Sequence, residues 1–454
     1  MVQVIKINRG LDINLKGKPE MMVLQPAESD YFTIFPDDFT GFSPKVAVKQ
    51  GDKVLAGTMI LYDKNNPDIK IVSPVSGEII SVNRGEKRKL LSIVISADKE
   101  TGYRDFGKRD VLQLTAWEIK QQLCEAGIFP FIRQRPYGYG ANPSDTPRDI
   151  FISGIYSSPL APSLELILKN QEADFQAGLD ALAKLTPGKV YLGIRPDCNI
   201  PALNGAGNVE QVCFKGPHPV GNVGVQINHI KPVNKGEIVW TIDPADVLFI
   251  GRLFNKGMAD FSRLVALCGS EVKQTGYHQM LPGASIKDLI TNNTTEGVVL
   301  RYISGNVLTG IKIEVEGSLH AFDNQITVIP EGSETSEFLG WASPGFSKFS
   351  NSRTFPSKFI GRLTGKEFVL DARIKGGKRA MIMSNEYDKV FPMDILPEFL
   401  LKAIIAFDID KMESLGIYEV IPEDFALCEF VDTSKIELQS IVRKGLDLLY
   451  NEMK

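Results

Sequence analysis

The chain of 454 residues is poor in cysteine. Its five cysteines are widely spaced, no pair has Cys-x-x-Cys spacing, and the odd number disfavours a disulfide framework or a zinc ribbon. A conventional iron–sulfur motif also needs clustered thiols and is disfavoured for the same reason. We expect free and mostly buried thiols in a reducing compartment, at Cys124, Cys198, Cys213, Cys268 and Cys428.

Long apolar runs are missing as well. No stretch approaches the roughly 18 apolar residues that a membrane-spanning helix needs. The best candidate, residues 399–407, is short and contains Lys402. The N-terminus also lacks the hydrophobic region and cleavage site of a signal peptide. We expect a soluble, cytoplasmic chain without a span of its own, which reaches a membrane only through partner proteins.

An excess of basic residues is absent too, which disfavours a general nucleic-acid binder. Lysine and arginine number 51 against 55 aspartates and glutamates, so the net charge is −4. The sequence has no Ser-His-Asp order, paired-carboxylate motif or Walker loop, so a stand-alone hydrolase or ATPase has no support. What remains is an ordinary globular composition, 43% hydrophobic and 23% charged, long enough for several domains.

The first hundred residues read as β-structure, because short β-branched runs alternate with glycine turns. The spacing of Gly51, Val54 and Gly57, followed by residues 73–77, resembles the biotinyl/lipoyl-domain pattern. In carrier domains of that kind a lysine at a hairpin tip is modified, and Lys64 lies near this place. The connection is long and contains Pro67, which disfavours a tight hairpin. A structural barrel or sandwich is therefore the favoured interpretation over a modified Lys64.

From about residue 111 the pattern becomes mixed α/β. Thr115 and Glu118 have the spacing of a capping box, which predicts a helix that ends at Gly127. Residues 149–154 and 189–194 read as strands. Between them, residues 162–185 read as one or two helices, with an inward face formed by Leu164, Leu168, Phe175, Leu179 and Leu182. This order indicates an open α/β layer.

The remainder divides into three parts. Residues 258–330 read as a β-grasp-like unit with a single short helix that begins near Ser285. Residues 331–380 read as extended or rich in loops. The C-terminus reads as helical, because Leu400, Leu401, Ile404 and Ile405 form one apolar stripe and residues 434–437 have the spacing of a second capping box.

An ordered set of segments resembles one family, the A subunits of bacterial sodium-translocating NADH:quinone reductases. Each segment alone is weak, but together they cover nearly the whole chain in one register. They are residues 6–12, 63–67, 73–77, 82–88, 177–182, 188–191, 216–219, 340–345, 391–394 and 423–431. The resemblance implies kinship with the flavin- and NADH-binding subunit of respiratory complex I and with the C subunit of Rnf complexes.

The resemblance also implies a mixed α+β chain of five parts. These are a biotinyl/lipoyl-like β-domain (1–105), an α/β domain related to the flavin-binding domain of complex I (106–257), a β-grasp-like module of the soluble-ligand-binding (SLBB) type (258–330), a loop-rich segment (331–380) and a C-terminal helical domain (381–454).

The relatives' cofactor sites have degenerated in this chain. Where they carry a glycine-rich loop for the flavin phosphate, residues 127–137 are bulky, and Pro130 and Pro136 remove amide donors. Where they cluster cysteines in the helical domain, only Cys428 remains, and one thiolate cannot hold a cluster that needs four. We therefore expect no FMN, no iron–sulfur cluster and no metal site in this chain.

Quinone binding is the remaining role that the family implies. A quinone is a flat ring with two carbonyls, and it needs an apolar cleft with hydrogen-bond donors. The candidate residues are Phe129, Phe131, Arg133, Arg135, Tyr137 and His218. The alternatives are that the aromatics only pack the loop, that the arginines face solvent or a partner, and that His218 is a turn histidine bonded to backbone.

Three hypotheses follow. The first is a quinone-binding subunit, for ubiquinone or menaquinone, on the cytoplasmic face of the bacterial inner membrane, peripheral through membrane-embedded and other partner subunits. The second is a cofactor-free scaffold of the same complex. The third and weakest is a soluble flavin diaphorase. Catalysis by the isolated chain is left open.

Overall fold

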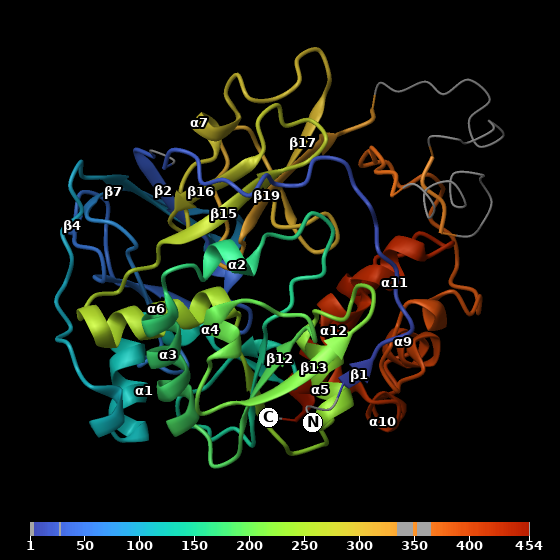
Figure 1. Ribbon diagram of the computed structural model, residues 1–454, viewed down its shortest axis with the longest axis horizontal. Coiled ribbons are helices and arrows are strands. Elements are labelled where there is room, and N and C mark those ends of the chain that lie inside the picture. The colour runs from blue at the N-terminus through green and yellow to red at the C-terminus, as the bar shows by residue number, and fades with distance from the viewer. Residues whose placement is uncertain (1–3, 27–28, 334–347, 352–364, 454) are drawn as a thin grey trace.

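The computed structural model describes residues 4–26, 29–333, 348–351 and 365–453. Four β-sheets of seven, five, four and three strands form its framework, and the last part of the chain is helical. The sheets and helices pack side by side, with the C-terminal helices next to the seven-stranded sheet (Figure 1). The expected mixed fold is therefore confirmed.

The N-terminal domain is a barrel-sandwich of two small sheets. One has the order β2 (Tyr31–Ile34), β8 (Leu90–Ala97), β7 (Gly77–Arg84) and β4 (Lys53–Val54). The other has the order β3 (Pro44–Val46), β5 (Met59–Asp63) and β6 (Lys70–Val72). Branched side chains from both sheets, such as Ile60 and Ile93, are fully buried between them, which supplies the apolar burial that stabilises so small a domain. Lys64 lies exposed in the loop between β5 and β6.

The seven-stranded sheet has the order β1, β13, β12, β11, β14, β9, β10. Its strands are β1 (Val4–Lys6), β13 (Glu210–Lys215), β12 (Val190–Ile194), β11 (Ile150–Ser153), β14 (Val239–Thr241), β9 (Arg133–Arg135) and β10 (Tyr139–Gly140). The strands from β1 to β14 are parallel, and β9 and β10 are antiparallel. From β11 the chain winds first toward β13 and later back to β14, so a crevice forms at the carboxyl ends of β11 and β14.

The helices of the α/β domain largely follow the sequence pattern. They are α1 (Ala116–Glu125), α2 (Leu164–Ile167), α3 (Glu172–Lys184), α4 (Pro201–Asn204), α5 (Val223–Ile230) and α6 (Pro244–Lys256). At the start of α1, the Glu118 amide donates to the Thr115 hydroxyl and the Thr115 amide donates to the Glu118 carboxylate. The first capping box is thus confirmed. The predicted inward face of α2 and α3 is buried to 5% exposure or less.

The third unit is a five-stranded sheet with one short helix, as expected for an SLBB-type module. Its strand order is β16 (Gly276–Met280), β15 (Arg263–Cys268), β19 (Gln325–Pro330), β17 (Leu300–Ser304) and β18 (Ile311–Ile313). The helix α7 (Lys287–Ile290) begins shortly after Ser285. Residues 340–345, which contributed to the family resemblance, lie outside the described residues.

The C-terminal part contains α9 (Pro397–Ile405), α10 (Ile409–Ser414), α11 (Ala426–Val431) and α12 (Leu438–Glu452). The second predicted capping box is wrong, because α12 begins one residue after it and has no side-chain cap. The Asp432 carboxylate instead accepts the amides of Ser434 and Ile436. Ile405 also departs from its predicted stripe and is 49% exposed.

The first residues of the chain run across three of these units (Figure 1). After β1 has paired with β13, Leu15 forms a bridge with Phe368, and Val23 forms one with Tyr277 of β16. We call residues 4–26 the N-terminal strap. It delivers backbone to the α/β sheet before the chain enters the barrel at β2, which the sequence pattern did not predict.

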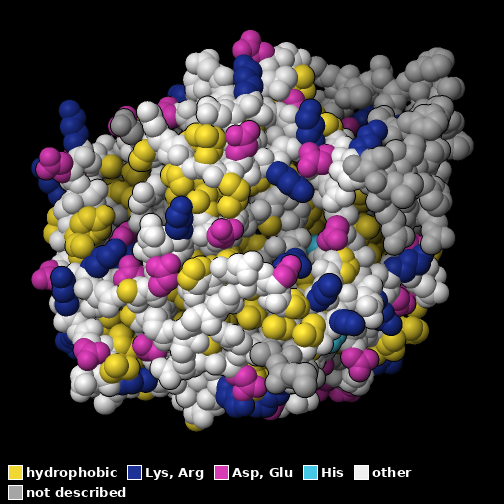
Figure 2. All heavy atoms as spheres, viewed as in Figure 1, with side chains coloured by type: hydrophobic (Ala, Val, Ile, Leu, Met, Phe, Trp, Pro, Cys, Tyr) yellow, Lys and Arg dark blue, Asp and Glu magenta, His cyan; other side chains and the backbone are white. Residues whose placement is uncertain are grey.

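Acidic, basic and apolar side chains are interspersed over the face of the molecule in Figure 2. This mixture agrees with the small net charge of the chain. In the described part of the chain, no helix is both long enough and apolar enough to cross a membrane.

Candidate functional site

A cavity of about 510 Å³ lies at the carboxyl ends of β11 and β14. All four units contribute to its wall: Asp38 comes from the barrel, Arg133 from the α/β domain, Phe322 from the SLBB module and Glu423 from the C-terminal helices. Its volume falls in the range of small-molecule sites, and its position is the switch point where open α/β sheets bind ligands. This cavity is the candidate functional site.

Two arginines reach the cavity from β9. Arg133 and Arg135 are two residues apart, so their side chains leave the strand on the same face. The guanidinium carbon of Arg133 lies 4.0 Å from the centroid of the Phe322 ring. Among the described residues, no carboxylate or hydrogen-bond acceptor pairs with this guanidinium. Arg133 therefore presents free donors beside an aromatic face.

Arg135, in contrast, is already occupied. It is 1% exposed, and its Nη1 donates to Asp424 Oδ2 at 2.7 Å and to the carbonyl of Glu419 at 2.9 Å. A Cβ at Gly224 would lie 2.5 Å from the Arg135 Nη2, so only glycine lets α5 pack against this pair. The ion pair joins β9 to the 3₁₀ turn Pro422–Phe425 and anchors the C-terminal helices to the cavity wall.

An aromatic cluster forms the apolar side of the cavity. The Phe131 ring packs 5.2 Å from Phe322 and 5.9 Å from Phe39, with Phe249 and Phe261 also in contact. Phe131 and Phe322 both line the cavity, so the wall offers ring faces beside the Arg133 donors.

His218 enters the cavity from the turn that precedes α5. It is 4% exposed, its backbone joins Pro219 through a cis peptide, and its Nδ1 lies 3.0 Å from the Ser157 hydroxyl oxygen. Burial lowers the pKa of His218 from 6.5 to about 4. The imidazole is therefore neutral at physiological pH.

His320 faces the same cavity from the SLBB module, in a different electrostatic setting. Its Nδ1 lies 2.5 Å from Asp38 Oδ1, and Phe35 stacks on its ring at 4.4 Å. Burial alone would lower the pKa of His320, but the hydrogen bond and negative charge of Asp38 outweigh burial and raise it. The pair joins the barrel to the SLBB module.

A polar network with two aspartates forms the floor between the α/β domain and the SLBB module. The Tyr156 hydroxyl donates to Asp243 Oδ1 at 2.5 Å, and Asn324 donates to the same oxygen at 3.3 Å. Arg263 then links the Asn324 Oδ1 to Asp246, each at 2.9 Å. Burial raises the pKa of both aspartates, that of Asp246 to about 7, although Arg263 opposes the shift. These carboxyls can therefore hold protons near neutral pH.

Two predicted residues do not line the cavity. Phe129 is fully buried and packs edge-on against Trp240 at 5.5 Å. Tyr137 packs against Tyr450 at 5.1 Å. The structure thus brings four of the six predicted residues to the cavity: Phe131, Arg133, Arg135 and His218.

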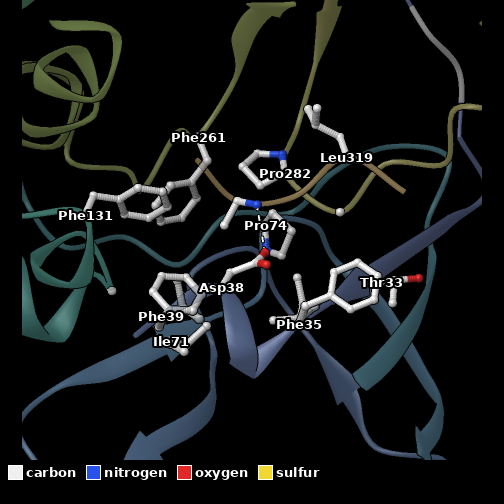
Figure 3. A pocket seen from close by; sticks show the side chains of 15 residues that line it. Thr33, Phe35, Asp38, Phe39, Ile71, Pro74, Phe131, Phe261, Pro282 and Leu319 are labelled. Atoms are coloured by element: carbon white, nitrogen blue, oxygen red, sulfur yellow. Dashed lines mark hydrogen bonds between the residues drawn. The ribbon is translucent and has the colours of Figure 1, made fainter. Parts of the chain in front are cut away.

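A second cavity lies behind Phe131, between the barrel and the SLBB module (Figure 3). Its volume of about 30 Å³ is enough for water but far too small for a quinone ring. In Figure 3 the rings of Phe131 and Phe261 lie face by face on one side, while Asp38 accepts the amide of Ala321 at 2.9 Å across the gap.

The sequence pattern missed most of the polar wall: Asp38, Tyr156, Ser157, Asp243, Asp246, His320, Asn324 and Glu423. A signal existed for two groups. Tyr156 and Ser157 follow the predicted strand of residues 149–154, and Asp243-Pro244 is a helix start directly after a strand. Residues that follow parallel strands gather at one edge. His320 and Asp38 gave no such signal, because they meet only through the packing of two domains.

The described residues contain no group of three or more histidines, cysteines or acids that could hold a metal ion. The five cysteines are free, and Cys428 is completely buried. At the former glycine-rich loop, Phe129–Phe131 forms a buried 3₁₀ turn, and a Cβ at Gly127 would contact Val72 at 2.7 Å.

Comparison with known proteins identifies the relatives of the chain. Family models match the NqrA N-terminal barrel-sandwich hybrid domain over residues 5–98, the NqrA second alpha/beta domain over 114–259 and the NQRA C-terminal domain, of SLBB type, over 264–315. Among solved structures, an NAD+-reducing [NiFe]-hydrogenase in the H2-reduced state matches 41% of this chain and 41% of that chain, at 13% identity. Its TM-score of 0.33 is too low to support an inference.

Full-length relatives share one name, which makes each of them the A subunit of a Na(+)-translocating NADH-quinone reductase. The protein of Alcanivorax borkumensis is 35% identical over 99% of this chain and 100% of its own length. Those of Rhodopirellula baltica and Vibrio anguillarum are each 36% identical over 99% of this chain, covering 98% and 100% of their own lengths. At this identity and coverage, the chain belongs to the NqrA family, the A subunits of Na(+)-translocating NADH-quinone reductases.

Proposed function

We propose that the chain is the peripheral NqrA component of a sodium-translocating NADH:quinone reductase and holds a quinone head group in the 510 Å³ cavity. The observation that carries the proposal is the guanidinium of Arg133, which no described carboxylate pairs and which lies 4.0 Å over Phe322 at the cavity wall. A quinone needs a ring face and a donor to its carbonyl at one place. Arg133, Phe322 and Phe131 supply both.

Reduction of a quinone to a quinol takes up two electrons and two protons. In this proposal the electrons come from NADH through redox groups of partner subunits. Asp243 and Asp246 line the cavity, and the raised pKa of each favours its protonated form. A carboxyl with a pKa near the working pH is suited to proton transfer. We assign these two residues as the local proton donors, and Tyr156, which bonds to Asp243 at 2.5 Å, as the link to the ring.

The roles of the remaining predicted residues follow from their surroundings. Arg135 is neutralised by Asp424, so we assign it to anchoring the wall. His218 presents an imidazole edge to the cavity and is a second donor to the ring. Phe129 and Tyr137 stabilise the loop from behind through Trp240 and Tyr450.

We further infer that the chain carries neither FMN nor an iron–sulfur cluster. The residues do not fit these groups: the buried side chains of Phe129 and Phe131 occupy the former phosphate loop. Cys428 is also fully buried, which raises its thiol pKa and opposes the thiolate that a metal needs. No step in this mechanism therefore involves these groups within this chain.

The same proposal places the chain on the cytoplasmic face of the bacterial inner membrane. The relatives are named as one component of a larger reductase, so the other subunits would hold this chain at the membrane. We retain the division at residues 105, 257, 330 and 380 as a proposal for its domains.

The test is a titration of the full-length chain with a water-soluble, short-tail ubiquinone, followed by calorimetry. We expect saturable binding that Arg133→Ala weakens by about tenfold to a hundredfold, the value of one hydrogen bond from a charged donor. The matched control is Arg109→Ala, an exposed arginine outside the cavity, which should leave the affinity unchanged. Equal affinities for Arg133→Ala and the parent chain would reject the proposed site.

A scaffold role without a ligand is the second candidate. The observation that favours it is the complete use of Phe129, Arg135 and Tyr137 in packing and ion pairing. Absence of saturable binding at millimolar quinone, with the chain folded, would decide for the scaffold.

A further inference from the structure

The backbone of His218 is held from both sides by the N-terminal strap. Its amide donates to Asp12 Oδ1 at 2.9 Å, and its carbonyl accepts the amide of Leu11 at 2.8 Å. A Cβ at Gly10 would lie 2.2 Å from that carbonyl oxygen, and Gly10 has a φ of +145°, so only glycine permits this approach. Residues 10–12, a motif that the sequence resemblance singled out, therefore fix the position of the histidine.

The ring of His218 is oriented by Ser157, which follows β11. Ser157 Oγ lies 3.0 Å from Nδ1 and also accepts the Gly221 amide at 2.9 Å. Gly221 itself cannot take a side chain, because a Cβ would lie 2.7 Å from Ser157 Oγ. The hydroxyl is thus pinned between the imidazole and the backbone that leads into α5.

The hydrogen-bond balance at Ser157 determines which ring nitrogen carries the proton. The Gly221 N–H uses one acceptor position of Oγ, and the hydroxyl proton needs an acceptor of its own. Among the described residues, Nδ1 of His218 is the acceptor within reach. When Nδ1 accepts, the proton of a neutral imidazole resides on Nε2.

We propose that Ser157 and Asp12 are positioning residues that hold His218 in its uncharged Nε2–H form, so that this N–H donates to a carbonyl oxygen of the quinone. The inference rests on the proposed function of the cavity and assigns the orientation of one donor in it. Among the described residues no hydrogen bond reaches Nε2, and His218 lines the cavity.

The chemical advantage is a donor that does not change with pH. Burial keeps the ring neutral and is the cause of its lowered pKa. The Ser157 hydroxyl keeps the proton on Nε2. An imidazole of fixed tautomer is a preorganised donor that requires no reorientation when charge develops on the quinone oxygen.

The test uses full-length chain labelled with ¹³C,¹⁵N-histidine, because the ring ¹⁵N and ¹³Cδ2 shifts distinguish the tautomers. Only four histidines are present, and His218→Gln assigns the signal. We expect the Nε2–H form at pH 6 to 8, lost to a tautomer mixture in Ser157→Ala and retained in Ser157→Thr. Asp12→Ala should broaden or shift the His218 signal, and Asp12→Asn, which keeps the acceptor oxygen, should restore it.

Quinone titrations of the same variants complete the test. Ser157→Ala should weaken short-tail quinone binding by about tenfold, the loss of one oriented hydrogen bond, with affinity restored in Ser157→Thr. Ser144→Ala, a serine away from the cavity, is the control and should match the parent.

Two failures are distinguishable. A parent His218 that is charged, or protonated on Nδ1, overturns the positioning role whatever the chain binds. A parent chain with the expected tautomer but no saturable quinone binding overturns the carbonyl contact and the proposed function together, while the tautomer assignment stands.

Discussion

The two walls of the cavity carry their charges differently. The inner wall, formed by the α/β domain and the C-terminal helices, is electrically settled: Arg135 is paired with Asp424, and His218 is neutral. The outer wall, formed by the barrel and the SLBB module, holds the ion pair of Asp38 and His320. The contrast teaches that the same residue type acts as a fixed neutral donor or as a titrating cation according to its partner.

The largest expected effect comes from removing the countercharge of the inner wall. Asp424→Ala leaves Arg135 buried without a partner, which should destabilise the chain by about 3–5 kcal/mol. The midpoint of thermal unfolding measures the change. The matched control, Glu296→Ala in the exposed pair with Lys273, should barely move the midpoint, because exposed pairs contribute little. An Asp424→Ala chain as stable as the parent would show that the inner wall does not depend on this pair.

The second prediction separates binding from stability at β9. Arg133→Lys keeps the charge but loses the planar group that lies over Phe322, so quinone affinity should fall by about tenfold. Thermal stability should remain near that of the parent, because no described residue depends on this guanidinium for an ion pair. Calorimetric titration and thermal unfolding together test the claim, and a large loss of stability would contradict it.

The third prediction uses pH to compare the two histidines. The folded-state pKa of His320 is raised above 6.5, so its contribution to stability is complete below pH 6.5 and is lost as pH rises through the folded value. His320→Gln should therefore lower the unfolding midpoint at pH 6 and have less effect at pH 9. The facing groups are Asp38 and Asp323.

His218 should behave in the opposite way. Its folded-state pKa is lowered to about 4, so the native chain loses stability as pH falls from 6.5 toward 4. His218→Gln should reduce this acid-dependent loss. Midpoints recorded from pH 5 to 9 for both variants test the contrast, and parallel profiles would remove the distinction between the two walls.

Local patterns predicted much of the fold, because each depended on neighbours in sequence. The capping box at Thr115 formed as expected, and the inward face of α3 followed from its periodicity. The similar box at residues 434–437 did not form, because Asp432 offered its carboxylate to the same amides first. Local spacing therefore predicts a cap only where no nearby side chain competes for it.

The candidate site was harder to predict. Residues 127–137 supplied three of the predicted cavity residues, but the sequence could not distinguish Phe131, which faces the cavity, from Phe129, which packs on Trp240. It also gave Arg133 and Arg135 equal weight, since their difference depends on Asp424, almost 300 positions later in the chain. Pairings between domains are decided by tertiary packing and leave little local trace.

The N-terminal strap has a consequence for the order of synthesis. Its residues leave the ribosome first, yet their partners are Phe214 in β13, Tyr277 in β16 and Phe368. Contacts so distant along the chain form slowly, and domains complete themselves in order of emergence. The opening residues must therefore wait, unpaired, until more than three quarters of the polypeptide has been made, and their docking closes the assembly of the native molecule.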